Sequence, residues 1–291
     1  MEITKLNLFM PRCLGDIVIA LPIAGYYRDA GLSVTWPIDR PFYPTAKAAA
    51  PWVNWVPYNH EAAFPGETNV ELYERNGLSG FFEEPGAIVA QIFNVDYEPH
   101  ETDMHMKFDQ FRYNVAKVPF LFKWKLAEYV TRYPEQEAEL KAKVVKSDRY
   151  IVTHTKGSTA TLTLNTSDLE AQGFQVIEIV PGLTENAFNW LGVIESAAHC
   201  HMFDSSFANI IDQMQLTVPK TFYRRSLWKM TPVMAMNWNF GPAPVDIIEQ
   251  VKADHVRRRV DPLESKEFVE LYHRIQANRH NFMRKTMGYR I

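Results

Sequence analysis

Few cysteines and no long apolar run occur in this sequence, and each shortage excludes a class of protein. Its 291 residues contain two cysteines, Cys13 and Cys200, which are too few for a disulfide framework and favour a reducing compartment. The longest apolar run, residues 17–27, is interrupted by Pro22 and is far shorter than the roughly 20 residues of a membrane span. The N-terminus lacks the basic and apolar segments of a signal peptide. We therefore expect a cytoplasmic protein without a membrane span.

An excess of positive charge and the common nucleotide-binding motifs are also missing. Lysine and arginine number 31 against 34 acidic residues, a formal net charge of −3, so a polyanion could be bound only by a local basic patch. The sequence contains neither the Gly-x-Gly-x-x-Gly fingerprint of dinucleotide-binding enzymes nor a P-loop. An NAD-dependent enzyme is therefore disfavoured, and a P-loop phosphate site is not expected.

Apolar strand patterns and helical patterns alternate along the chain, and the alternation restarts past its middle. Hydrophobic residues make up 46% of the sequence, which is ordinary for a globular protein, and the length suits two domains. The strands we expect are residues 6–10, 32–36, 52–57, 87–93, 150–154, 175–180, 199–203 and 220–223. The helices we expect between them are residues 17–30 (ended by Gly31), 42–50, 166–172, 187–198 and 206–214.

This alternation predicts an α/β fold. Strands that alternate with helices form parallel sheets covered on both faces. We expect two Rossmann-like βαβ domains, residues 1–145 and 146–291, that face each other across a cleft. Residues 97–130 are aromatic and basic and are expected to be helical, as are the stretch 135–146 and a polar C-terminal tail, 245–280.

The loop after the first expected strand, residues 11–15, is the first candidate for a site. Open α/β folds bind ligands at the carboxyl edge of the sheet, where this loop lies. Gly15 permits a tight turn, and Asp16 opens the next helix. A carboxylate at that position is either a helix cap or a group directed into the ligand crevice, and the loop alone leaves both open.

Two further loops follow strands of the second half. The first consists of Thr155, Lys156, Gly157, Ser158 and Thr159. Hydroxyls, backbone N–H groups and an ammonium can bind a diphosphate without a metal, although an ordinary solvated turn has the same composition. The second loop, Asp204 and Ser205, precedes a helix whose free N–H groups would favour an anion, unless the two side chains only cap that helix.

Together, residues 12–22, 151–159 and 194–209 resemble the ADP-heptose:lipopolysaccharide heptosyltransferases, a family of GT-B glycosyltransferases. The resemblance extends from residue 6 to about residue 215. It departs from the family motif Asp-Thr/Ser-Gly-x-x-His, because Ser206 replaces the glycine and Asn209 the histidine, at positions nearest the donor sugar. The chain is thus similar to a divergent, compact member, such as one encoded by a phage.

The resemblance implies a GT-B fold and a role for each loop. Asp16 is the base that deprotonates the acceptor hydroxyl. The donor phosphates and sugar are held by Thr155, Lys156, Gly157, Ser158, Thr159, Asp204, Ser205, Ser206 and Asn209. Lys156 stabilises the leaving diphosphate, the anomeric carbon is inverted, and closure of the two domains excludes water. We expect no cofactor and no metal, which agrees with the absence of the Asp-x-Asp motif of single-domain glycosyltransferases.

The acceptor side is expected to include Arg12, Gly15, Arg112, Lys123 and Trp124. Residues 108–124 interleave aromatic and cationic side chains, which could stack on sugar rings or on a base flipped from DNA. The same pattern also fits an amphipathic helix with a buried aromatic face. The acceptor is therefore either a lipopolysaccharide-type glycan or a hydroxymethylated pyrimidine in DNA. The basic clusters 224–225 and 257–259 are interpreted as solvated surface.

Two histidine pairs are set aside as metal ligands. His100 and His105 are five residues apart rather than the four that share a helix face, and His199 and His201 share a strand face but lack a third ligand. Two alternatives to a glycosyltransferase stay open. One is a non-catalytic GT-B-fold binding protein, and the other is a nucleotide-sugar epimerase, which would need no acceptor.

Overall fold

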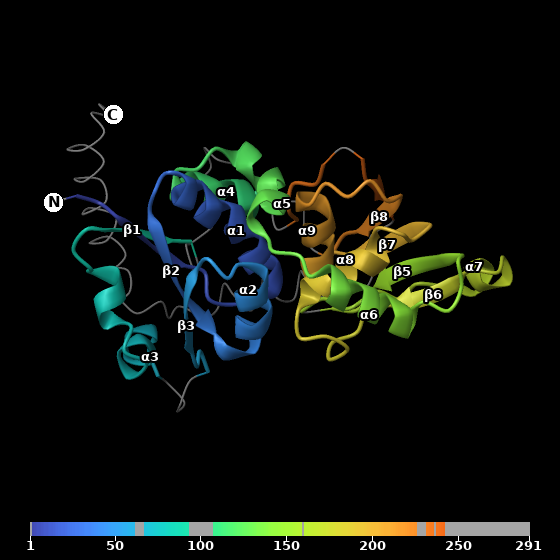
Figure 1. Ribbon diagram of the computed structural model, residues 1–291, viewed down its shortest axis with the longest axis horizontal. Helices are drawn as coiled ribbons and strands as arrows, with labels where there is room; N and C mark the ends of the chain where they lie inside the picture. The colour runs from blue at the N-terminus through green and yellow to red at the C-terminus, as the bar shows by residue number, and fades with distance from the viewer. Residues whose placement is uncertain are drawn as a thin grey trace, which may run out of the picture.

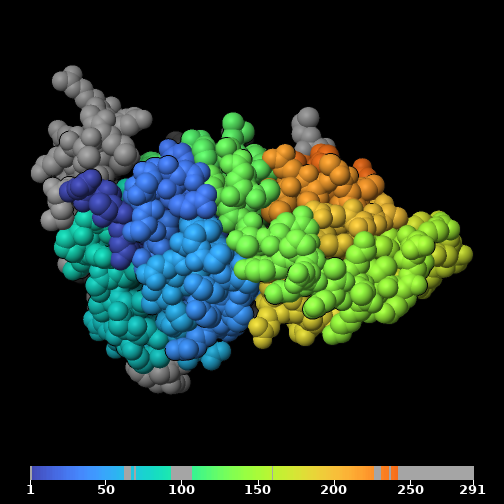
Figure 2. All heavy atoms as spheres, viewed as in Figure 1, coloured from blue at the N-terminus to red at the C-terminus, as the bar shows by residue number. Residues whose placement is uncertain are grey.

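The protein forms two lobes, each built on a parallel β-sheet (Figure 1). The computed structural model describes residues 2–61, 67–92, 107–158, 160–225, 231–235 and 237–241. The lobes lie side by side and are in direct contact, with the first in blue to teal and the second in yellow to orange (Figure 2). One contiguous hydrophobic cluster runs through both, from Leu8 and Val18 in the first lobe to Cys200 and Ile210 in the second.

The first sheet has the strand order β3-β2-β1-β4, and its neighbouring strands are all parallel. Its strands are β1 (Lys5–Phe9), β2 (Ser33–Asp39), β3 (Asn54–Tyr58) and β4 (Ala87–Gln91). The connections contain η1 (Arg40–Phe42), α2 (Tyr43–Ala49), α3 (Asn69–Arg75) and η2 (Ser79–Phe82). The order reverses between β1 and β4, which places a topological switch point beside the carboxyl end of β1.

Helix α1 (Leu14–Asp29) connects β1 to β2 and lies between the two lobes. Residues 17–25 are all buried, because the helix packs against α9 and α5 as well as its own sheet. A helix that is apolar on every side requires such a position. Pro22 lies inside it without ending it. The helix ends as predicted near Gly31, which has the left-handed φ of 89°.

The second sheet has the order β6-β5-β7-β8-β9, again with parallel neighbours. Its strands are β5 (Tyr150–His154), β6 (Gln175–Glu178), β7 (His199–Phe203), β8 (Lys220–Tyr223) and β9 (Asn239–Phe240). The connections contain α7 (Ser167–Ala171), η5 (Ala187–Trp190), α8 (Leu191–Ile194) and α9 (Ser206–Gln213). Here the switch point lies between β5 and β7.

Most expected elements are present, and the predicted α/β fold is confirmed. The bounds of β5, β7 and β8 agree with the prediction. The helical region expected at 97–130 is broken in its described part into α4 (Phe108–Ala116), η4 (Phe120–Lys125) and α5 (Leu126–Tyr129). The break occurs because Lys117 adopts a left-handed φ of 59° and Pro119 follows. The tail expected at 245–280 lies outside the described residues.

The boundary expected after residue 145 separates the strands of the two sheets. However, α6 (Pro134–Val144), which precedes that boundary, packs against η5 and α8 of the second lobe. Helix α3 was not expected, although Thr68 and Glu71 form a capping box at its start.

Candidate functional site

The carboxyl edges of the two sheets meet at the first turns of α1 and α9. Gly15 in α1 lies against the start of α9, where a Cβ on this glycine would be 3.4 Å from the Cα of Ser206. Ligands in open α/β sheets bind at such edges, beside the switch points. The loops after β1, β5 and β7 therefore converge on one place, at the junction of the lobes.

Asp16 lies in the first turn of α1 and is held by an arginine from α4. Its Oδ1 accepts a hydrogen bond from Arg112 Nη1 at 2.6 Å, and both side chains are partly exposed. The N-cap of α1 is Cys13, which has a φ of 64° and makes no side-chain cap bond. The alternative that Asp16 is the helix cap is therefore wrong, and its carboxylate is directed to a residue far away in the sequence.

The turn after β7 and the first turn of α9 contain two buried side-chain oxygens that have no partner among the described residues. Asp204 and Asn209 are almost fully buried, yet Asp204 Oδ2 and Asn209 Oδ1 accept no hydrogen bond from any described residue. Burial raises the pKa of Asp204 to about 6, and the charge of Arg225 opposes that shift. Such unpaired buried groups cost free energy and are concentrated at functional sites.

Ser205, the N-cap of α9, is positioned by a histidine at the end of β5. Its Oγ lies 2.7 Å from His154 Nδ1 and makes no cap bond to α9. His154 also packs on Phe207, with ring centroids 4.9 Å apart. Burial lowers the pKa of His154 to about 4, so the imidazole is neutral near pH 7. The first N–H groups of α9 are thus not capped by Ser205.

The backbone of the loop after β5 forms hydrogen bonds within the loop. Both the N–H and the hydroxyl of Thr155 donate to Glu178 Oε1 at 2.8 Å, so Thr155 faces β6. Gly157 N–H donates to Ala160 O at 2.8 Å, and Lys156 forms an antiparallel bridge with Thr161. The side chains of Lys156 and Ser158 are exposed. Thr159, also expected at the donor site, lies outside the described residues.

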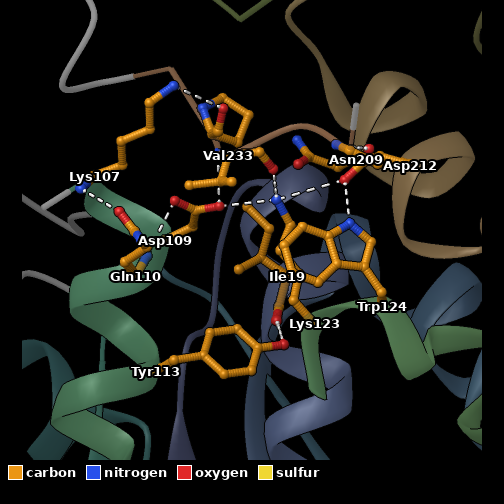
Figure 3. Close-up of polar contacts among 12 residues, drawn as sticks. Ile19, Lys107, Asp109, Gln110, Tyr113, Lys123, Trp124, Asn209, Asp212 and Val233 are labelled. Atoms are coloured by element: carbon orange, nitrogen blue, oxygen red, sulfur yellow. Dashed lines mark hydrogen bonds and ion pairs between the residues drawn. The ribbon is translucent and has the colours of Figure 1, made fainter. Parts of the chain in front are cut away.

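Lys123 and Trp124, expected on the acceptor side, instead join the two lobes (Figure 3). Lys123 is fully buried, with its Nζ 2.8 Å from Asp109 Oδ2 and 3.6 Å from Asp212 Oδ2, and it also donates to the carbonyl of Val233. Trp124 Nε1 donates to Asp212 Oδ2 at 2.9 Å. The charge of Lys123 is compensated inside the protein, and Trp124 binds the same aspartate, so we assign neither residue to an acceptor site.

A second polar cluster, which the sequence analysis did not find, lies at the carboxyl ends of β2 and β3. Arg12, expected on the acceptor side, pairs with buried Asp39 at 3.4 Å. Asp39 also accepts from the N–H of His60 at 3.2 Å, and the hydroxyl of Tyr58 lies 2.6 Å from His60 Nδ1. Burial lowers the pKa of His60 to about 4. The signal available in the sequence was Tyr58, directly after the expected strand 52–57, whereas Asp39 lies three residues beyond the expected strand 32–36.

Arg225 was also missed, because its doublet with Arg224 was interpreted as solvated surface. It follows β8 at the same carboxyl edge and donates to Ser158 Oγ in the loop after β5. Arg224, by contrast, is exposed and stacks on Phe240, 5.4 Å from the ring centroid.

Both histidines of β7 form hydrogen bonds with side chains of β8. His199 Nε2 lies 2.9 Å from Thr221 Oγ1, and His201 Nδ1 lies 3.0 Å from the hydroxyl of Tyr223. In the described part of the chain, no three His, Cys, Asp or Glu side chains are grouped as metal ligands. His100 and His105 lie outside that part.

A pocket of about 570 Å³ lies at another part of the junction, between α2, α6 and the loop 183–189. Its buried amide side chains form hydrogen bonds with each other and with a neighbouring hydroxyl. Asn186 Nδ2 donates to Asn189 Oδ1 at 3.2 Å, and Asn189 Nδ2 donates to Thr184 Oγ1 at 2.9 Å. None of the expected site residues lines it, so the candidate site is the convergence of Asp16 with the turn after β7.

Comparison with solved structures relates the fold to glycosyltransferases. A glycosyl transferase family 9 structure from Veillonella parvula is similar to this chain with a TM-score of 0.54 and 9% identity, over 87% of this chain and 90% of that one. Escherichia coli heptosyltransferase WaaC with ADP-2-deoxy-2-fluoro heptose has a TM-score of 0.43 and 12% identity, over 88% and 99%. The iron-containing dodecameric glycosyltransferase TibC from enterotoxigenic E. coli has a TM-score of 0.48 and 12% identity, over 84% of this chain. The chain spans 65% of the TibC chain.

No protein-family model matches the sequence, and comparison with curated proteins gives no match. At such low identities, the similarity to the Veillonella structure shows the fold alone, which is the α/β fold of the GT-B type that the sequence predicted. None of the described helices is both long and apolar enough to cross a membrane.

Proposed function

We propose that this chain is a glycosyltransferase that moves a sugar from a nucleoside-diphosphate donor to a hydroxyl acceptor at the junction of its lobes. One observation carries the proposal. The first turn of α1, with Asp16, packs against the first turn of α9, so the carboxyl edges of both sheets supply groups to the same place. An inverting transfer at such a junction needs a base from one lobe beside a donor site on the other.

The donor site we propose is the turn from Asp204 to Ser206 with Asn209. The uncapped start of α9 offers N–H groups and a positive dipole end to a phosphate. The unpartnered oxygens of Asp204 and Asn209 would accept hydrogen bonds from sugar hydroxyls. Lys156, exposed at the end of β5, would supply a positive charge to the diphosphate without a metal ion.

The reaction is a single displacement. Asp16 takes the proton of the acceptor hydroxyl as the acceptor oxygen forms its bond to the anomeric carbon. On the opposite side, the bond from that carbon to the phosphate oxygen breaks, and its electron pair leaves with the diphosphate. The configuration is thereby inverted. Arg112, which donates to Asp16 Oδ1, orients the carboxylate toward the acceptor hydroxyl.

The two candidate acceptors are a glycan and a hydroxymethylated pyrimidine in DNA. The cluster of Arg12, Asp39 and His60 at the ends of β1 to β3 lies at the carboxyl edge of the first sheet, where an acceptor would approach. Hydrogen-bonding groups of this kind suit a polyhydroxyl acceptor better than a flipped base, which needs an exposed aromatic platform. A glycan is therefore the first acceptor to test.

The first measurement is the thermal stability of the full chain with ADP, UDP and GDP and with their sugars, each with and without EDTA. A ligand present at about 100 times its Kd adds roughly 2.7 kcal/mol of stability. We expect a selective shift with one nucleotide that EDTA leaves unchanged. The absence of a shift with every nucleotide contradicts the proposal.

Asp16→Ala then separates catalysis from binding. We expect loss of sugar transfer while the affinity for the donor stays within a few-fold of wild type. The matched control is Asp168→Ala, because Asp168 is an exposed aspartate in the first turn of α7 and should leave transfer unchanged. Equal loss of binding and transfer in folded Asp16→Ala would make Asp16 a structural residue.

A non-catalytic binding protein is the second candidate, favoured by the pairing of Asp16 with Arg112. It would bind the nucleotide sugar but transfer nothing to any acceptor, and Asp16→Ala would then have no activity to remove. An epimerase would convert the donor sugar without an acceptor, which the same donor panel reveals by analysis of the sugar product.

A further inference from the structure

Arg225 differs from the other arginines at the junction because, among the described residues, it forms no ion pair with a carboxylate. Arg112 is paired with Asp16 at 2.6 Å and Arg12 with Asp39 at 3.4 Å. Within the described part of the chain, the partner of the Arg225 guanidinium is the hydroxyl of Ser158. A guanidinium without a carboxylate partner, at the carboxyl edge of a sheet, can bind an anion through two parallel hydrogen bonds.

The path of Arg225 across the loop after β5 depends on a glycine. A Cβ at residue 157 would lie 3.0 Å from Arg225 Cδ and 3.1 Å from a ring carbon of Phe203. Gly157 therefore lets the arginine pass close to the backbone and reach Ser158. The loop and the residue after β8 thus form one unit beside the switch point between β5 and β7.

The charge of Arg225 influences the pKa of one residue in each lobe. Among the charges near Asp204 it is the strongest, and it opposes the rise of that pKa caused by burial. It also acts on Cys13 in the first lobe, where burial raises the thiol pKa and Arg12, Arg112 and Arg225 oppose the rise. The hydrogen bond to Ser158 and the close approach to Gly157, beside Phe203 at the end of β7, place this arginine at the loops after β5 and β7.

Lys156 is less well placed for an anion at that position. Its backbone pairs with Thr161 in the outer part of the loop, and its side chain is exposed. We propose that Arg225, supported by Ser158 and Gly157, is the residue that binds the donor diphosphate and stabilises its negative charge as it leaves. This inference rests on the proposed function, and it moves the main contact with the diphosphate from Lys156 to Arg225.

The test compares four variants of the full chain in binding ADP, UDP, GDP, the matching nucleosides and inorganic pyrophosphate, by calorimetry. For the diphosphate that wild type binds, Arg225→Ala should weaken affinity by about 10- to 100-fold, the range for a hydrogen bond to a charged group. Nucleoside affinity should be unchanged, and pyrophosphate affinity should fall in parallel. Arg225→Lys should recover part of the loss.

Arg224→Ala is the matched control, because Arg224 adds the same charge one residue away but stacks on Phe240 outside the site. It should stay within about twofold of wild type, a change worth under 1 kcal/mol, and Lys156→Ala should lose less than Arg225→Ala. Folded Arg225→Ala with wild-type diphosphate affinity, or a larger loss in Lys156→Ala, overturns the inference and leaves the proposed function standing. If wild type binds no diphosphate or pyrophosphate, both fail together.

Discussion

At the scale of single residues, Asp204 shows how a buried charge can mark a site. Its side chain is 3% exposed, one carboxylate oxygen lacks a partner among the described residues, and burial raises its pKa to about 6. A carboxyl whose native pKa exceeds its unfolded value of roughly 3.9 binds its proton more tightly in the native state. Its ionisation therefore lowers stability as pH rises from about 4 to 6.

Asp204→Asn should remove this cost. We expect the variant to be more stable than wild type above pH 6, by about 2–3 kcal/mol, and the difference to shrink toward zero below pH 4. Denaturant unfolding of both proteins between pH 4 and 8 measures it. A difference that is the same at every pH would mean that the proton of Asp204 is not linked to folding.

At the scale of elements, the contact between the lobes depends on side chains of α4, η4 and α9. Asp212 in α9 accepts from Trp124 Nε1, from Trp238 Nε1 at 2.9 Å and from the N–H of Ala235 at 2.7 Å. Lys123 lies between this carboxylate and that of Asp109 (Figure 3). These buried charges are compensated only as a group, so the loss of one leaves the others unpaired.

Lys123→Met should therefore destabilise the protein by about 3–5 kcal/mol, the range for breaking a buried ion pair on one side. Lys125→Met is the control, since Lys125 makes an exposed contact with Glu128 at 3.4 Å and should cost less than about 0.5 kcal/mol. Urea unfolding gives both values. A cost below about 1 kcal/mol for Lys123→Met would show that the two carboxylates are adequately paired without it.

The packing of α1 on α5 provides a second prediction at this scale. A Cβ on Gly25 would lie 2.4 Å from the ring of Tyr129, and that ring is held by a hydrogen bond to Asp29 at 2.9 Å. Gly25→Ala should cost about 1–3 kcal/mol through overpacking. Gly80→Ala, where nothing lies within 4 Å, should be neutral in the same unfolding measurement; equal effects would contradict the packing account.

At the scale of the whole molecule, one hydrophobic cluster of buried residues spans both lobes. It includes Ile19 and Leu21 of α1 together with Ile211 of α9, and the hydroxyl of Thr45 in α2 donates to the carbonyl of Glu185 across the junction. A junction of this kind resists independent movement of the lobes. Any closure on a substrate must therefore be small or must disrupt the contacts of Lys123.

Heating should consequently unfold both lobes in a single transition, with equal calorimetric and van't Hoff enthalpies. Differential scanning calorimetry of the full chain measures this directly. Two separate transitions would show that each lobe has its own stability and that the junction contributes little, which would allow the domain closure expected from the family resemblance.

The amino-acid sequence by itself determined where most strands and helices lie and which loops follow the ends of strands. Strands β5, β7 and β8 have the predicted bounds because a short apolar run between turn residues is a local signal. The same signal located Asp204 at the end of a strand and Asp16 at the start of the helix that follows the first strand. The tertiary structure alone decided which distant side chains meet there. Arg112 reaches Asp16, Arg225 reaches Ser158, and Lys123 is buried between two aspartates. Such pairs depend on the packing of whole elements, and an aromatic, basic helical stretch has the same pattern whether it faces a substrate or the other lobe.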